Sequence, residues 1–202
     1  MMFEVCGTKI PRSSLAMALT PTTSIPLGFS APAFELPDAR TGDMLHSKDL
    51  LSGGPSVVVF MCNHCPFVVH ILNAFVDFAR EYTARGVNVV AISSNDVTTH
   101  PQDDVPHMKQ LAEQKNFCFP YLFDESQDVA RAYDAACTPD FSVFDAQGIC
   151  VYRGQFDASR PGNDVAVTGE DMRQVCDALL AGGTIPAEGQ IPSIGCNIKW
   201  KA

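Results

Sequence analysis

Two cysteines separated by two residues, in the segment Cys62-Asn63-His64-Cys65, constrain the fold of this chain more than any other feature. The segment follows the run 56–61, which is rich in β-branched and aromatic residues and is typical of a strand buried on both faces. It precedes a helix predicted over 66–83, where apolar side chains recur at three- and four-residue steps. The sequence therefore predicts a pair of thiols at the point where a buried strand ends and a helix begins.

The other predicted elements alternate between strands and helices. A short extended element near Met44 and a short helix over 47–51 come before the buried strand. After the first long helix, the patterns predict strands over 88–93, 120–123, 141–144 and 149–152, and helices over 104–115, 126–133 and 172–180. This order implies an α/β fold in which a central mixed β-sheet is flanked by helices on both faces.

We expect one domain between two terminal segments. Residues 1–25 are turn-rich and lack an apolar period, so they are predicted to form an irregular N-terminal arm. Residues 26–185 carry all the predicted elements, and they suffice for a full hydrophobic core. Residues 186–202 are rich in Pro and Gly, and we expect a C-terminal tail packed on or near the domain.

Charge and hydropathy exclude several classes of partner. The chain has 14 Lys and Arg against 23 Asp and Glu, a formal net charge of −9, which argues against nucleic acid and against an anionic membrane surface. The apolar stretch 15–19 is shorter than the core of a signal peptide, and no run approaches the ~20 residues of a membrane-spanning helix. We therefore expect a cytoplasmic protein, in which the eight cysteines are not a disulfide framework.

The setting of the two cysteines favours redox chemistry. The unpaired N–H groups and partial positive charge at a helix N-terminus stabilise a thiolate relative to a thiol. We expect Cys62 to be exposed, to have a depressed pKa and to act as the nucleophile, with Cys65 as its disulfide partner. An imidazolium at His64 would stabilise the thiolate further. The alternatives at this point are two buried apolar cysteines or half of a zinc site.

The chain resembles the thioredoxin superfamily over about residues 20–201, and most closely its peroxiredoxin-like, AhpC/TSA-related branch. The resemblance implies a thioredoxin fold with a peroxiredoxin-type N-terminal extension and a central α-β-α insertion over 104–133. It rests on Ala31-Pro32-Ala33-Phe34-Glu35-Leu36-Pro37, Phe60-Met61-Cys62-Asn63-His64-Cys65-Pro66-Phe67, Ala136-Cys137-Thr138-Pro139-Asp140-Phe141, Tyr152-Arg153-Gly154-Gln155 and Ser193-Ile194-Gly195-Cys196-Asn197-Ile198-Lys199-Trp200.

The same resemblance implies where a substrate binds. It places a cis proline at Pro139, opposite the cysteines, and leaves the backbone of Thr138 free to pair with a substrate segment. Met61 stands where thioredoxins have tryptophan, and Gly154 matches a groove position, so we expect both to contact substrate. The implied partners are a protein or small-molecule disulfide and a reducing system of the thioredoxin reductase or glutathione type. No cofactor is implied.

Two further cysteines are candidate third thiols. Cys137 lies two residues before Pro139 and is expected either to face the pair or to be a small buried residue. Cys196 is expected either to fold back as a resolving or ligand cysteine or to pack as an ordinary tail residue. Arg153 lies beside the Gly- and Pro-rich loop 154–169, where it either contacts substrate or, as we expect, is solvated.

These residues predict a thiol–disulfide oxidoreductase in which Cys62 attacks a substrate disulfide and Cys65 resolves the mixed disulfide. One alternative is a copper or zinc site formed by the same cysteines with His64, because thiolate and imidazole suit both metals. Another is a thiol peroxidase. The resemblance then makes Cys65 the peroxide-cleaving residue, although Cys62 occupies the place of the peroxiredoxin threonine.

Overall fold

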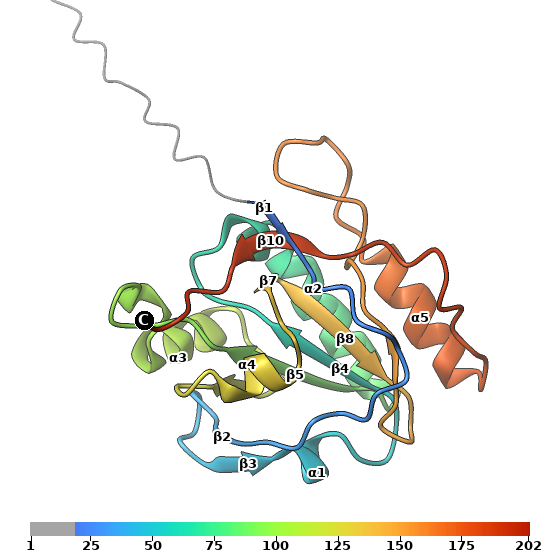
Figure 1. The fold of residues 1–202 in the computed structure, drawn as a ribbon, viewed down its shortest axis with the longest axis horizontal. Coiled ribbons are helices and arrows are strands. Elements are labelled where there is room, and N and C mark those ends of the chain that lie inside the picture. The colour runs from blue at the N-terminus through green and yellow to red at the C-terminus, as the bar shows by residue number, and fades with distance from the viewer. Residues whose placement is uncertain (1–18) are drawn as a thin grey trace, which may run out of the picture.

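The computed structural model describes residues 19–202, and a five-stranded mixed sheet lies at its centre (Figure 1). The strand order is β6-β5-β4-β8-β9. The central strand β4 is parallel to β5, which is parallel to β6, whereas β8 is antiparallel to both β4 and β9. The strands are β4 (Ser56–Phe60), β5 (Asn88–Ser93), β6 (Tyr121–Phe123), β8 (Asp140–Phe144) and β9 (Cys150–Tyr152). The central mixed sheet expected from the sequence is therefore present.

Alternate residues of the sheet face two separate halves of the core, because successive side chains of a strand point to opposite faces. Val57 and Val59 belong to the half covered by α2 (Pro66–Ala84), α3 (Val105–Gln114) and α5 (Glu170–Leu180). Val58 and Phe60 belong to the half covered by α4 and the N-terminal extension. That half is closed by β2 (Glu35–Pro37), β3 (Met44–His46), α1 (Ser47–Leu50) and α4 (Asp128–Ala132). Helices thus lie on both faces, as predicted.

Helix α2 fixes the position of the two cysteines. Cys65 is its N-cap residue and Pro66 stands in its first turn, where the missing N–H of proline costs no hydrogen bond. The helix ends before Gly86, which has a left-handed φ of 95° that favours glycine. Across residues 19–202, no helix is both long enough and apolar enough to cross a bilayer.

The two ends of the described chain meet in a small antiparallel sheet over the domain. Its strands are β1 (Leu19–Pro21), β10 (Ile194–Asn197) and β7 (Cys137–Thr138), with β10 in the middle. Figure 1 shows the red C-terminal strand running between the blue N-terminal strand and β7. The tail therefore lies against the domain, and the end of the predicted irregular arm is instead a strand. The rest of that arm, residues 1–18, lies outside the described residues.

Candidate active site

Cys62 and Cys65 lie in the connection between β4 and α2. The strand ends at Phe60, and Cys65 is the N-cap residue of the helix, where the backbone N–H of Val68 helps to lower the pKa of its sulfur. Both cysteines are free thiols, and the ionisation of each depends on the other. The structure therefore assembles a dithiol at the place that the sequence predicts.

Both cysteines are buried, which differs from the expectation for Cys62. Cys62 is 1% exposed and Cys65 is 0% exposed. The Sγ atom of Cys62 lies 3.6 Å from the hydroxyl of Thr138, and the Sγ atom of Cys65 lies 3.0 Å from the carbonyl oxygen of Thr138. On the tail, the sulfur of Cys196 lies 3.1 Å from that of Cys65. The returning tail and the loop before the cis Thr138–Pro139 bond therefore cover the dithiol.

The surroundings of the reduced dithiol favour ionisation of Cys65 over ionisation of Cys62. A hydrogen bond from Cys62 lowers the pKa of Cys65 to about 5 against the opposing effect of burial, and Thr138 and Cys196 add to the lowering. The same hydrogen bond, together with burial and the charge of Asp103, raises the pKa of Cys62 well above its ordinary value. The expectation of a depressed pKa at Cys62 is therefore wrong for the reduced site, because the interaction with Cys65, burial and the charge of Asp103 all oppose ionisation of Cys62.

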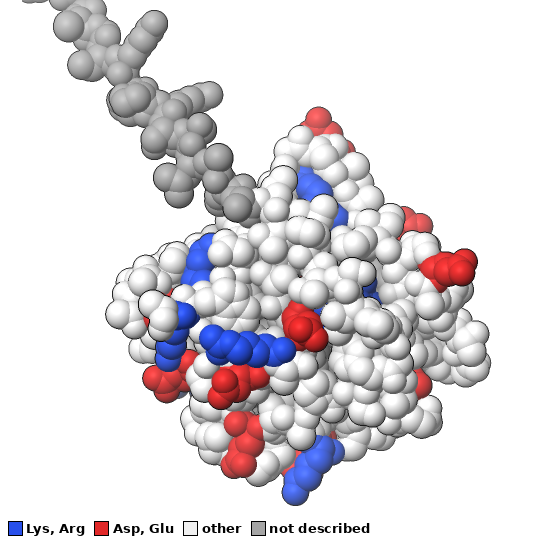
Figure 2. Space-filling view, viewed as in Figure 1, with Lys and Arg blue, Asp and Glu red and all other residues white. Residues whose placement is uncertain are grey.

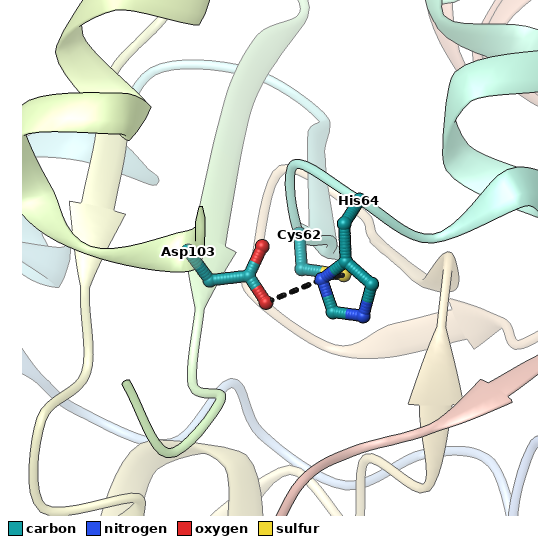
Figure 3. A group of neighbouring side chains, drawn as sticks. All are labelled: Cys62, His64 and Asp103. Atoms are coloured by element: carbon teal, nitrogen blue, oxygen red, sulfur yellow. Dashed lines mark hydrogen bonds and ion pairs between the residues drawn. The ribbon is translucent and has the colours of Figure 1, made fainter. Parts of the chain in front are cut away.

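His64 forms an ion pair with Asp103, a residue that the sequence does not single out (Figure 3). The Nδ1 atom of His64 is 2.7 Å from Asp103 Oδ2 and 3.8 Å from the sulfur of Cys62. The other carboxylate oxygen of Asp103 accepts the backbone N–H of Asn63 at 2.8 Å. Asp103 lies between β5 and α3, where no local motif marks it as functional. The imidazole therefore reaches the dithiol, as expected, and is oriented by an unexpected carboxylate.

The ion pair predicts a stability that depends on pH. The hydrogen bond to Asp103 raises the pKa of His64 against burial. Burial acts to raise the pKa of Asp103, but hydrogen bonds from His64 and Asn95 outweigh it and leave that pKa lowered. The stabilisation is then complete only between about pH 4 and 6.5, the ordinary pKa values of the two groups. It declines as pH falls through the lowered pKa of Asp103 and as pH rises through the raised pKa of His64.

We therefore expect Asp103→Asn to lower the free energy of unfolding by about 2 kcal/mol at pH 5.5, the usual size of a hydrogen bond to a charged group. The loss should shrink at pH 8.5. Urea unfolding of both proteins at the two pH values measures it, and His64→Gln is the matched control that removes the other partner. Equal losses at both pH values would show that the pair contributes no charge interaction.

The same three side chains have the composition of a metal site. The candidate ligand atoms of Cys62, His64 and Asp103 all lie within 4.8 Å of one another. Sulfur, nitrogen and carboxylate oxygen are all ligands of zinc, at about 2.0–2.3 Å. An ion bound there would have to replace the direct bond between His64 and Asp103 and the proton of Cys62. These three residues can therefore bind a metal only if the bond between His64 and Asp103 is broken and Cys62 loses its proton.

The four residues expected to contact substrate are all buried in this structure. Met61 directly precedes Cys62 and belongs to the core, and Pro139 lines the same small cavity as Met61. The backbone of Thr138 is paired with β10, so the free edge that the resemblance implied is occupied. Gly154 lies beneath the tail, where its carbonyl oxygen accepts the hydroxyl of Ser193 at 2.7 Å. The expectation of an open substrate groove therefore differs from the structure, because the tail fills it.

Only one of the two candidate third thiols reaches the dithiol. The sulfur of Cys137 lies 3.9 Å from the hydroxyl of Thr22 and 3.6 Å from the carbonyl oxygen of Pro139, and burial raises its pKa. It is a packed core residue, the second of the two interpretations. Cys196 is the cysteine at contact distance from Cys65.

Arg153 is buried, in contrast to the prediction of a solvated side chain. Its guanidinium donates to the carbonyl oxygens of Tyr133 and Asp134 at 2.8 and 3.2 Å and to the hydroxyl of Ser142 at 3.0 Å. It also lies 3.9 Å from the buried carboxylate of Asp140. Arg153 therefore ties β8 to the segment after α4 and supports the strand that follows the cis proline.

The mixed sheet, the helices on both of its faces and the position of the dithiol define a protein of the thioredoxin fold. The family description AhpC/TSA matches residues 27–153, which is more than half of the chain. The chain belongs to the AhpC/TSA family.

Solved structures support this assignment. An uncharacterized conserved protein from Geobacillus kaustophilus is 50% identical, with a TM-score of 0.90 over 93% of this chain and 98% of its own. A hypothetical protein from Sinorhizobium meliloti 1021 is 45% identical, with a TM-score of 0.88 over 91% and 99%. A thiol:disulfide interchange protein of the thioredoxin family from Chlorobium tepidum TLS is 17% identical, with a TM-score of 0.59 over 78% and 99%, and shares the fold. The comparison with curated proteins finds no match.

Proposed function

We propose that this chain is a thiol–disulfide oxidoreductase that uses Cys62 and Cys65 as a reversible disulfide pair. The observation that supports it is a pair of free thiols, three positions apart at the N-terminus of α2, whose pKa values are coupled. The surroundings favour ionisation of one of the two, because they lower the pKa of Cys65 to about 5. A thiolate beside a second thiol is the arrangement that disulfide exchange requires.

In the proposed reaction, Cys65 first takes the proton of Cys62. The Cys62 thiolate then attacks one sulfur of a substrate disulfide, a mixed disulfide forms, and the departing substrate sulfur takes the proton from Cys65. The Cys65 thiolate next attacks the sulfur of Cys62 and closes the Cys62–Cys65 disulfide, and the second substrate sulfur leaves as a thiolate. Two electrons have passed from the dithiol to the substrate, and a reducing partner of the thioredoxin reductase or glutathione type returns them.

The proposed substrates are disulfides of proteins or small molecules, and the proposed location is the cytoplasm. Nucleic acid and membrane surfaces are not proposed partners, because the net charge is −9 and basic side chains lie among acidic ones on the face in Figure 2. His64 is proposed to adjust the ionisation of the dithiol through its contact with Cys62. Since both sulfurs are covered, the approach of a substrate requires displacement of β10 or of the loop that carries His64.

The reversible disulfide is tested by a redox titration. Equilibration in glutathione buffers followed by acid quenching and peptide mapping should show a Cys62–Cys65 disulfide, with a Nernst slope of about 30 mV for each tenfold change in equilibrium constant. Cys118→Ser, which removes an exposed thiol outside the site, is the control and should leave the titration unchanged. A protein in which these two cysteines stay reduced in every buffer would contradict the proposal.

The lowered pKa of Cys65 favours a second candidate, a thiol peroxidase. The Cys65 thiolate would attack one oxygen of a peroxide and break the O–O bond, giving a sulfenic acid and a hydroxide or alkoxide ion that takes a proton from solvent. Cys62 would then attack the sulfenic sulfur, close the disulfide and release water. Rapid peroxide consumption, with a sulfenic acid trapped at Cys65 in Cys62→Ser, would favour the peroxidase. A Cys62→Ser protein with no sulfenic acid at Cys65 would exclude the peroxidase.

The cluster of Cys62, His64 and Asp103 favours a third candidate, a copper or zinc protein. Reduced protein incubated with each metal and then desalted would distinguish it. Stoichiometric metal that is lost from both Cys62→Ser and Asp103→Asn would favour metal binding. If Cys62 and Cys65 both still react with an alkylating reagent after incubation with the metal, the result would favour the oxidoreductase.

A further inference from the structure

We propose that Cys196 is the third thiol of this site and that the disulfide moves from Cys62–Cys65 to Cys65–Cys196. This inference rests on the proposed exchange function and extends it to the C-terminal tail. Its basis is the 3.1 Å distance between the sulfurs of Cys65 and Cys196, which are 131 positions apart in the sequence. That separation is roughly 1 Å longer than a disulfide bond of about 2.05 Å, so a small shift brings the atoms to bonding distance.

Strand β10 holds Cys196 at this position from both of its edges. Cys196 pairs with Thr138 on β7, the residue whose carbonyl and hydroxyl oxygens contact the dithiol. On the other edge, Cys196 pairs with Leu19 on β1. The sulfur therefore belongs to a hydrogen-bonded sheet and is presented to Cys65 in a defined register.

Gly195 allows the tail to lie this close to the site. A Cβ atom at this position would overlap the carbonyl group of Thr138. Any residue with a side chain would push β10 away from β7 and would separate Cys196 from Cys65. A substitution at Gly195 should therefore move the sulfur of Cys196 away from Cys65 while all three cysteines remain in the protein.

The tail also occupies the backbone edge that the thioredoxin resemblance assigns to a substrate segment. An extended segment that pairs at this edge gains its affinity from main-chain hydrogen bonds. Strand β10 pairs there and carries a cysteine next to the dithiol. The tail thus has the geometry of a disulfide-exchange partner that is part of the same chain.

The transfer is an internal thiol–disulfide exchange. The Cys196 thiol gives up its proton as its sulfur attacks the Cys65 sulfur of the oxidised pair, the Cys65–Cys196 bond forms and the Cys62–Cys65 bond breaks. The electron pair leaves on the sulfur of Cys62, which takes up the proton that Cys196 has lost, so no oxidant or reductant is consumed. Cys196 is 7% exposed, against 1% for Cys62, and the transfer therefore moves the disulfide to the sulfur that a reducing partner reaches most easily.

Disulfide mapping tests this step. Reduced protein is oxidised with glutathione disulfide, free thiols are blocked with N-ethylmaleimide after acid quenching, and the linked peptides are identified by mass spectrometry. The wild type should contain both Cys62–Cys65 and Cys65–Cys196. Cys62→Ser, incubated until its slower oxidation reaches equilibrium, should contain Cys65–Cys196 as its main intramolecular disulfide, and Cys196→Ser should contain Cys62–Cys65 alone.

Two variants control for nonspecific pairing. Cys137→Ser removes the buried cysteine next to Thr138 and should leave the wild-type pattern unchanged. Gly195→Ala keeps all three sulfurs and should deplete Cys65–Cys196 while retaining Cys62–Cys65. Absence of Cys65–Cys196 from both the wild type and Cys62→Ser would overturn the role of Cys196. That result would leave the oxidoreductase proposal intact if Cys62–Cys65 still forms, whereas loss of Cys62–Cys65 from the wild type would overturn the proposed function itself.

Discussion

Cys62→Ser is expected to lower the rate constant for reduction of a small-molecule disulfide by at least about a thousand-fold, the scale of losing a covalent nucleophile. Serine has nearly the shape of cysteine, so its hydroxyl keeps the contact with Thr138 and the fold should persist. The hydroxyl is a far weaker nucleophile than a thiolate at neutral pH. Reaction of the reduced protein with glutathione disulfide, followed by appearance of the mixed or internal disulfide, measures the rate.

Cys65→Ser distinguishes the roles of the two cysteines. If Cys62 is the attacking residue, this variant should still react with the disulfide but should accumulate the mixed disulfide at Cys62, because the resolving thiol is missing. Cys137→Ser, which changes a buried cysteine that does not contact the dithiol, should react like the wild type. A Cys62→Ser variant that keeps most of the rate, beside an inactive Cys65→Ser, would assign the attack to Cys65.

Arg153→Ala is expected to lower the free energy of unfolding by about 3–5 kcal/mol, the usual cost of leaving one member of a buried ion pair without its partner. The side chains of Arg153 and Asp140 are 4% and 1% exposed. Removal of the guanidinium leaves the carboxylate of Asp140 buried and takes donors from the carbonyl oxygens of Tyr133 and Asp134. Urea unfolding monitored by circular dichroism measures the change.

Arg85→Ala is the matched control for this substitution. Arg85 also pairs with an aspartate, Asp177, at 2.7 Å, but the two side chains are 42% and 53% exposed. Solvent screening limits such pairs to about 0–1 kcal/mol. If Arg153→Ala destabilised the protein no more than Arg85→Ala does, the buried guanidinium would not be a support of the strand after Pro139.

The sequence predicts the centre of this fold well because the relevant signals are local. The β-branched runs identify β4 and β5, and the bounds of β5 agree with the prediction over 88–93. The apolar period over 66–83 identifies α2, which extends over Pro66–Ala84. The place of the dithiol follows from these two elements, since Cys62 and Cys65 lie between them.

The features that the sequence does not reveal depend on contacts between distant residues. Strand β10 has only four residues and no alternation of polarity, and it exists because β1 and β7 pair with it. The contact of Cys196 with Cys65 depends on that pairing. Asp103 reaches His64 from 39 positions away, and no spacing rule predicts such a contact. Arg153 is charged and next to a loop, so the general preference of arginine for solvent gives the wrong answer.

If the dithiol is oxidised reversibly as proposed, the small sheet formed by β1, β10 and β7 will link the docking of the C-terminal strand to the oxidation state of the sulfurs beneath it. The C-terminus can dock more tightly on one of the two oxidation states. The difference in docking free energy then equals the change that docking causes in the free energy of reduction, because linked equilibria are reciprocal. A molecule that binds only the undocked C-terminus would then change the equilibrium constant for oxidation of the dithiol. Oxidation of the dithiol would change the affinity of that molecule by the same factor. Binding at the C-terminus would therefore regulate the redox equilibrium allosterically.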